Sequence, residues 1–385
     1  MAVGDLLERE SNNQVVFEGD SSVKKVMLNR PRKLNTLTHQ MISQMTKRLE
    51  DYEKEPEVKL VMLKGNGKAF CAGGDMVAIY KFLIAGDWSF CASYFNKLFT
   101  LQYLVSTYNK PMVAIIDGVV MGGGALVSML ANFKIVTENT VFALPEGALG
   151  SDVGGSYILS RLPGYFGEYL GLTGARIDGA EMIACGLATH FVLSKDLQLL
   201  ENALDKVDSS DTSAISHLIG KFVHTPNIKQ HSAYGRLQIV NKCFSGKIVE
   251  DILLALETEI ENGADEKWTV DSVNLMKSCS PLSLKVSLKL IREGRRQNLE
   301  ECLILDYTAF CHVLLGTVSN DVYEGVRAKL SGKDEKPKWQ PSKLELVTKE
   351  MVDRYFEKSV DEKEWIFLKL SPRSNLVDNM MSSKL

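Results

Sequence analysis

Two glycine-rich segments, KAFCAGGD (68–75) and GVVMGGGA (118–125), contain the residues whose types and spacing are best suited to chemistry on a carbonyl group. Each segment follows a strand-like apolar run and precedes a helical pattern. Glycine permits positive φ and close approach of the backbone, so such a turn can point a backbone N–H outward at the start of a helix, where an anion is favoured. Two such N–H groups that converge on one point would form an oxyanion hole.

Each turn has a simpler explanation when it is taken alone, namely a tight connection between a strand and a helix. Neither turn is a nucleotide-binding loop. KAFCAGGD lacks the G-K-[ST] ending of a phosphate-binding loop, and the preceding Gly65-Asn66-Gly67 lacks the third glycine of the dinucleotide motif. The two turns together, followed by Pro145-Glu146, favour the functional interpretation.

The elements that must position these turns alternate between strands and helices in the first part of the chain. Apolar, partly β-branched runs predict strands at 23–29, 58–64, 112–116, 134–136 and 140–143. Between the first two, Met41, Met45 and Leu49 recur at helical spacing and predict a helix over 38–52, which indicates an α/β layer. Helical patterns follow at 157–162, 164–172, 179–185, 197–207, 249–262, 281–294, 298–315 and 349–357. Residues 208–230 are polar and less periodic, as a boundary would be.

Composition excludes several classes of protein. The 385 residues carry 45 Lys and Arg against 48 Asp and Glu, a net charge of -3, which excludes a globally basic nucleic-acid binder. The seven cysteines show no CxxC and no Cys/His ligand spacing, so we expect reduced thiols and no metal site. The apolar run from Pro111 to Ala131 contains Asp117 and four glycines, which predicts a strand, a turn and a helix rather than a membrane span.

A set of motifs covers nearly the whole chain: NRPRKLNTL (29–37), GKAFCAGGD (67–75), VVMGGGA (119–125), TENTVFALPE (137–146), DVGGSYILSRLPG (152–164), GEYLGLTGARIDGAEMIACGLATHFV (167–192), SPLSLKVSLKLIREG (280–294) and EGVRAKLSGKDEKPKWQP (324–341). Together they resemble the enoyl-CoA hydratase (crotonase) superfamily and, within it, the plant 3-hydroxyisobutyryl-CoA hydrolases. The resemblance implies a crotonase-like spiral of β-β-α turns. It divides the chain into an acyl-CoA-binding core (1–207), a helical region (208–343) and a charged tail (344–385).

The resemblance also implies an activity, the hydrolysis of 3-hydroxyisobutyryl-CoA to 3-hydroxyisobutyrate and CoA in valine degradation. The thioester carbonyl would lie between the backbone N–H groups of Gly74 and Gly123. Glu146 would attack that carbonyl or activate a water for the attack. Asp152 would hold the 3-hydroxyl of the acyl group or assist proton transfer. No metal and no separate cofactor is implied, because CoA is part of the substrate.

Two alternatives are kept beside the hydrolase, namely an enoyl-CoA hydratase or isomerase and a CoA-binding paralogue with weak or no turnover. The hydratases of the superfamily use a second glutamate at the position of Leu126, and its absence argues against the first alternative. The second is motivated by a short link between Glu146 and Asp152, which lacks the aromatic residue and the proline usual in the hydrolases. It is also motivated by Leu98, which stands where relatives carry a glutamate that lines the pocket.

Further expectations concern binding partners and location. Four basic residues flank segments that contact CoA in the superfamily, so they could bind the CoA phosphates: Arg30, Arg32, Lys33 and Lys68. They could equally form a solvated basic rim. Ser383-Lys384-Leu385 at a free C-terminus predicts recognition by the peroxisomal import receptor and a peroxisomal location. The amphipathic helices after Val249 are compatible with packing on the chain itself or with a homo-oligomer.

Overall fold

Two β-sheets form the frame of the protein, as a computed structural model shows. The structure describes residues 13–19, 22–151, 154–263, 266–331, 335–357 and 367–373. Asp152 and the tripeptide Ser383-Lys384-Leu385 lie outside the described residues.

The larger sheet has six strands in the order β1 (Val15–Glu18), β2 (Val23–Leu28), β3 (Leu60–Gly65), β5 (Met112–Ile116), β7 (Phe133–Val136) and β10 (His190–Phe191). The smaller sheet has the order β4 (Ala69–Cys71), β6 (Val119–Met121), β8 (Val141–Ala143) and β9 (Ile177–Asp178). All pairs are parallel except β1–β2 and β8–β9. The predicted strands and the α/β class are confirmed, with small shifts at the strand ends.

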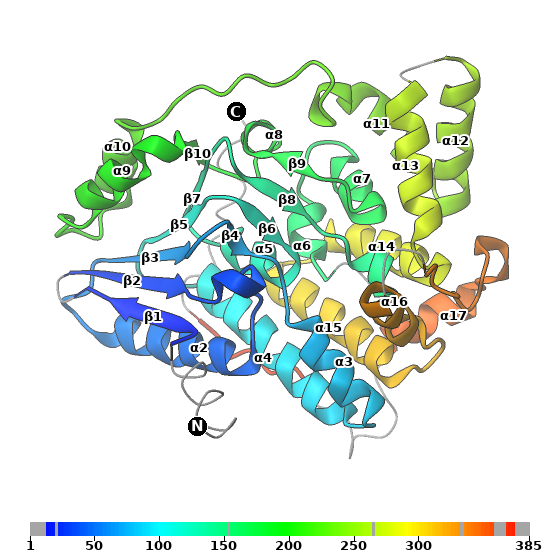
Figure 1. Cartoon of the computed structure of the whole chain (residues 1–385), viewed down its shortest axis with the longest axis horizontal. Helices are drawn as coiled ribbons and strands as arrows, with labels where there is room; N and C mark the ends of the chain where they lie inside the picture. Colours follow the sequence, from blue (N-terminus) through cyan, green and yellow to red (C-terminus); the bar gives the residue numbers. More distant parts are fainter. Residues whose placement is uncertain are drawn as a thin grey trace.

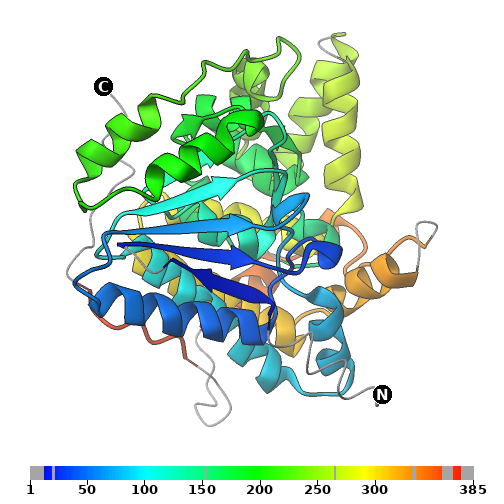
Figure 2. The same ribbon diagram turned by 60° about the vertical axis from the view of Figure 1, so that its left-hand side comes forward.

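Helices cover both faces of the larger sheet, which is why its central strands are continuous apolar runs. Helix α2 (His39–Lys54) lies on one face, and α9 (Leu197–Leu204) and α10 (Thr212–Gly220) lie on the other (Figure 2). Ile215 and Ile219 of α10 pack in the same apolar cluster as Leu60 and Val113 of the sheet. Helix α10 was not predicted from the polar segment 208–230, because only these two apolar side chains mark its buried face.

The C-terminal helices fold back onto the first part of the chain (Figure 1). Helix α14 (Pro281–Gly294) packs against α6 (Ser156–Leu159) and α7 (Phe166–Thr173), and α15 (Leu299–Leu315) packs along α4 (Trp88–Ser106). The remaining helices in this region are α11 (Leu237–Phe244), α12 (Val249–Glu261), α13 (Glu266–Ser278), α16 (Asp321–Ser331) and α17 (Lys349–Asp353). A helical C-terminal region is thereby confirmed, whereas the domain boundaries and a homo-oligomer stay predictions. Within the described ranges, no helix is both long and apolar enough to cross a bilayer.

Helix α5 (Gly122–Ser128) packs so closely against β4 that one of its glycines has no room for a side chain. A Cβ on Gly124 would lie 2.3 Å from Sγ of Cys71 and 2.9 Å from the carbonyl oxygen of Cys71. We expect Gly124→Ala to lower the free energy of unfolding by about 1–3 kcal/mol, measured by urea denaturation, because overpacking forces backbone shifts. Gly220→Ala is the matched control, since nothing lies within 4 Å of its Cβ. Equal stability of the two variants would contradict this packing.

Candidate functional site

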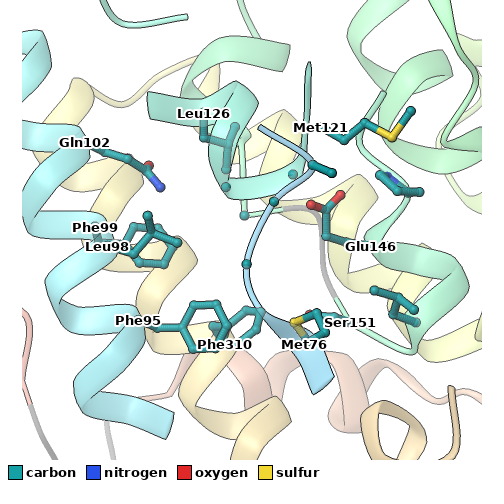
Figure 3. A pocket seen from close by; sticks show the side chains of 18 residues that line it. Met76, Phe95, Leu98, Phe99, Gln102, Met121, Leu126, Glu146, Ser151 and Phe310 are labelled. Carbon is teal, nitrogen blue, oxygen red and sulfur yellow. The ribbon is translucent and has the colours of Figure 1, made fainter. Parts of the chain in front are cut away.

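A cavity opens where three parallel strands of the smaller sheet end. Residues within three positions after the ends of β4, β6 and β8 line it, at the edge where open parallel sheets commonly bind ligands. Its empty volume, including the opening to solvent, is about 770 Å³. The lining residues are Ala72, Gly73, Gly74, Met76, Phe95, Leu98, Phe99, Gln102, Met121, Gly122, Gly123, Leu126, Pro145, Glu146, Leu149, Ser151, Gly154 and Phe310 (Figure 3).

The first glycine turn presents the backbone of Gly74 to this cavity. The N–H of Leu37 donates to the carbonyl of Gly73 (2.8 Å), and the N–H of Asp75 donates to the carbonyl of Leu37 (3.0 Å). In a parallel β-bridge, the residue that lies between the two hydrogen-bonded residues points its own N–H away from the partner strand. Here that residue is Gly74, between Gly73 and Asp75. The N–H of Gly74 therefore points away from Leu37. Gly73 has φ +100°, a conformation that glycine adopts without strain.

The second glycine turn starts α5, whose first residue, Gly122, has φ +52°. Gly123 is the second residue of α5, and no side chain caps this helix start. The first N–H groups of a helix have no acceptor within the helix, so the N–H of Gly123 is available to a ligand. A Cβ on Gly123 would lie 2.9 Å from Cδ2 of Leu98, and one on Gly74 would lie 2.8 Å from Oη of Tyr94. Both predicted glycines thus line one cavity and have little room for side chains.

Glu146 lies three residues after the end of β8, follows Pro145 and begins a short 3₁₀ turn, Glu146–Leu149. Its carbonyl accepts the N–H of Ser151 at 3.2 Å, which closes this turn. The carboxylate lies against the start of α5, because a Cβ on Gly122 would lie 2.8 Å from Oε1 of Glu146. Its Oε2 is shielded from solvent. The structure therefore places the predicted glutamate and the second glycine turn side by side (Figure 3).

A cysteine also lies beside the first turn, but it is not suited to act as a nucleophile. Cys71 is fully buried, and burial raises the pKa of its thiol to about 12. Nucleophilic attack needs the thiolate, so this residue stays chemically inert at neutral pH. Its Sγ contacts the carbonyl of Gly73 at 3.6 Å, a structural role within the turn.

The predicted role of Asp152 stays a prediction, although its neighbours Ser151 and Gly154 line the cavity. The short link before it is tightly packed, because a Cβ on Gly150 would lie 2.2 Å from the carbonyl oxygen of Asp321. Leu98 and Leu126, the two positions at which the resemblance led us to compare this chain with glutamates of the superfamily, both line the cavity and make its wall apolar there.

The four basic residues predicted to hold CoA phosphates do not line the cavity. Arg30 donates to the carbonyl of Thr36 (2.6 Å) and to Oδ2 of Asp75 (3.0 Å), and Oδ1 of Asp75 in turn accepts the N–H of Ala78 at the start of α3 (Met76–Ile84). Arg30 thus holds the segment that follows Gly74. The other three, Arg32, Lys33 and Lys68, are exposed. Their contact with CoA stays a prediction.

Several lining residues were not anticipated. Phe95, Phe99 and Gln102 recur at helical spacing on α4, a local signal that could have placed them on one wall. Phe310 comes from α15 and has no local signal, because only long-range packing brings α15 to α4. Over the described part of the chain, no group of three or more His, Cys, Asp or Glu side chains is arranged to hold a metal ion.

Most of the chain matches a known protein family and curated plant relatives. The family model described as enoyl-CoA hydratase/isomerase matches residues 23–356. The chain is 50% identical over 377 residues to probable 3-hydroxyisobutyryl-CoA hydrolase 3 of Arabidopsis thaliana, covering 97% of this chain and 100% of the relative. It is 50% identical over 372 residues to 3-hydroxyisobutyryl-CoA hydrolase 1 of the same plant, covering 96% and 97%.

A solved structure has the same fold as this chain over most of its length. The crystal structure of a carnitinyl-CoA dehydratase from Mycobacterium thermoresistibile matches with a TM-score of 0.82 at 33% identity, covering 93% of this chain and 99% of that one. This likeness confirms the predicted spiral fold.

Proposed function

This chain belongs to the enoyl-CoA hydratase/isomerase family, and we propose that within it the chain is an acyl-CoA thioester hydrolase that converts 3-hydroxyisobutyryl-CoA and water to 3-hydroxyisobutyrate and CoA. The observation that carries this proposal is the carboxylate of Glu146 beside two glycine turns in one cavity, with an apolar side chain, Leu126, at the position of the second glutamate of the hydratases. Adding water across a double bond uses paired carboxylates in this family, whereas attack on a thioester carbonyl needs one. The relatives at 50% identity support the substrate.

In the proposed reaction the thioester oxygen lies between the N–H groups of Gly74 and Gly123, which stabilise the negative charge that develops on it. Glu146 supplies the base that activates a water, or itself attacks the carbonyl carbon to form a mixed anhydride that a water then hydrolyses, which restores the carboxylate. The C–S bond breaks, the CoA sulfur leaves and takes up a proton, and an oxygen from water remains in the product carboxylate. The apolar walls formed by Phe95, Phe99 and Phe310 strengthen these electrostatic interactions by excluding water.

The test is release of free CoA from 3-hydroxyisobutyryl-CoA by the purified chain, followed with a thiol reagent. We expect steady turnover and no hydration of crotonyl-CoA. Hydration of crotonyl-CoA without CoA release would support a hydratase instead. Tight binding of the thioester by calorimetry, with neither reaction, would support a CoA-binding paralogue.

For localisation, we propose import into peroxisomes through Ser383-Lys384-Leu385. A fluorescent protein fused in front of the full chain should coincide with a peroxisomal marker in plant cells. Adding one residue after Leu385 should abolish this coincidence, because the receptor reads the tripeptide only at a free end. A mitochondrial pattern, or a peroxisomal pattern that survives the added residue, would contradict the proposal.

A further inference from the structure

One polar side chain on the wall of the cavity is not used by the fold. Gln102 of α4 is 2% exposed and lines the cavity among Phe95, Leu98 and Phe99. Its Nε2 is buried and donates no hydrogen bond to any of the residues that the structure describes. The amide group points into the cavity (Figure 3).

A buried amide without a partner is unusual, because the great majority of buried polar groups in folded proteins are hydrogen-bonded. An apolar residue at position 102 would continue the wall made by its neighbours without this cost. An unpartnered donor directed into a binding cavity indicates that the bound ligand supplies the acceptor. The amide is neutral and offers both a donor and an acceptor, which suits a hydroxyl group better than a carboxylate or an alkyl chain.

Gln102 lies near the predicted site of the thioester carbonyl, because both are close to Leu98 of α4. Leu98 lies against Gly123, since a Cβ there would be 2.9 Å from Cδ2 of Leu98. Gln102 is four residues further along α4, about 6 Å along the helix axis, on the same face. In a 3-hydroxyacyl thioester the hydroxyl oxygen lies within about 5 Å of the thioester oxygen, because four bonds join them. A hydrogen bond of about 3 Å from the hydroxyl can then reach a donor on this part of α4.

We propose that Gln102 is a specificity-determining residue, which donates its Nε2–H to the 3-hydroxyl oxygen of the acyl group while the thioester oxygen lies at Gly74 and Gly123. This inference rests on the proposed function, and it identifies the 3-hydroxyl as the feature of the acyl group that the site selects. The other predicted holder of the hydroxyl is Asp152. If Gln102 holds it, Asp152 is left for proton transfer.

The test compares kcat/KM for 3-hydroxyisobutyryl-CoA with kcat/KM for isobutyryl-CoA, which lacks only the hydroxyl. Gln102→Leu should lower the first value about 10- to 100-fold and leave the second within about threefold, because only the hydroxylated substrate loses a hydrogen bond. Gln44→Leu is the matched control. Gln44 of α2 also has a buried amide atom, Oε1, without a partner in the described part of the chain, but it does not line the cavity. The ratio of the two kcat/KM values should be the same in Gln44→Leu as in the wild type.

Other outcomes separate this inference from the proposed function. An unchanged ratio in Gln102→Leu, or a ratio that falls only in Asp152→Asn, would overturn the role of Gln102. If the wild-type chain releases CoA from neither thioester, the proposed hydrolase activity fails. In that case, the dissociation constants of the two thioesters, measured by calorimetry, test whether Gln102 binds the 3-hydroxyl. Weaker binding of only the hydroxylated thioester by Gln102→Leu supports the inference, and equal effects on both thioesters overturn it.

Discussion

Replacing Glu146 by glutamine is expected to reduce kcat for CoA release from 3-hydroxyisobutyryl-CoA by about 10²–10⁴-fold. The amide keeps the size of the side chain but can neither take a proton from water nor attack a carbonyl carbon. No other acidic side chain lines the cavity in the part of the chain that the structure describes, so no neighbour can replace it there. The free energy of unfolding should change little, because the substitution is nearly isosteric.

The measurement is initial rate against substrate concentration, with thioester binding followed separately by calorimetry. Binding by Glu146→Gln should stay close to that of the wild type, because the loss lies in the chemical step. Glu138→Gln is the matched control, since this carboxylate accepts the N–H of Ser194 at 2.9 Å and does not line the cavity. Activity of Glu146→Gln within a few-fold of the control would refute the assigned role of Glu146.

Replacing Gly123 by proline is expected to lower kcat by about 10²–10³-fold, because it removes one of the two N–H groups proposed to stabilise the oxyanion. Proline is tolerated in the first turn of a helix, where the N–H has no intrahelical partner, so α5 should still form. The bond to the oxygen strengthens as charge develops in the transition state. The loss should therefore appear in kcat more than in KM.

Gly123→Ala separates the missing N–H from added bulk. Alanine keeps the N–H and introduces a Cβ that would lie 2.9 Å from Cδ2 of Leu98, the far end of a flexible side chain that can move. We expect it to retain most of the activity that the proline variant loses. Equal activities of the two variants, with equal melting temperatures, would show that Gly123 is needed for space and not for its N–H.

The central strands of the larger sheet and helix α2 were predictable because their signals are local. β3 and β5 are apolar runs, and α2 has one buried face that includes Met41 and Leu49. In contrast, β4 and β6 were not predicted as strands. Each has three residues beside a glycine turn, and they pair with each other across about fifty residues of sequence. Helix α10 escaped prediction for a related reason, since its short buried face is surrounded by polar residues.

The sequence by itself determined the two glycine turns and Glu146, because a turn that only glycine can adopt and a carboxylate after a strand are written in neighbouring residues. The resemblance implied that Gly74, Gly123 and Glu146 act on one carbonyl, and the structure places all three on one cavity. Only the tertiary structure decided that Phe310 closes its wall and that Arg30 holds the backbone beside Gly74. It alone exposed the unpartnered amide of Gln102. The physical reason is that burial and hydrogen-bond satisfaction depend on long-range contacts, such as those of α15 with α4, which no stretch of neighbouring residues specifies.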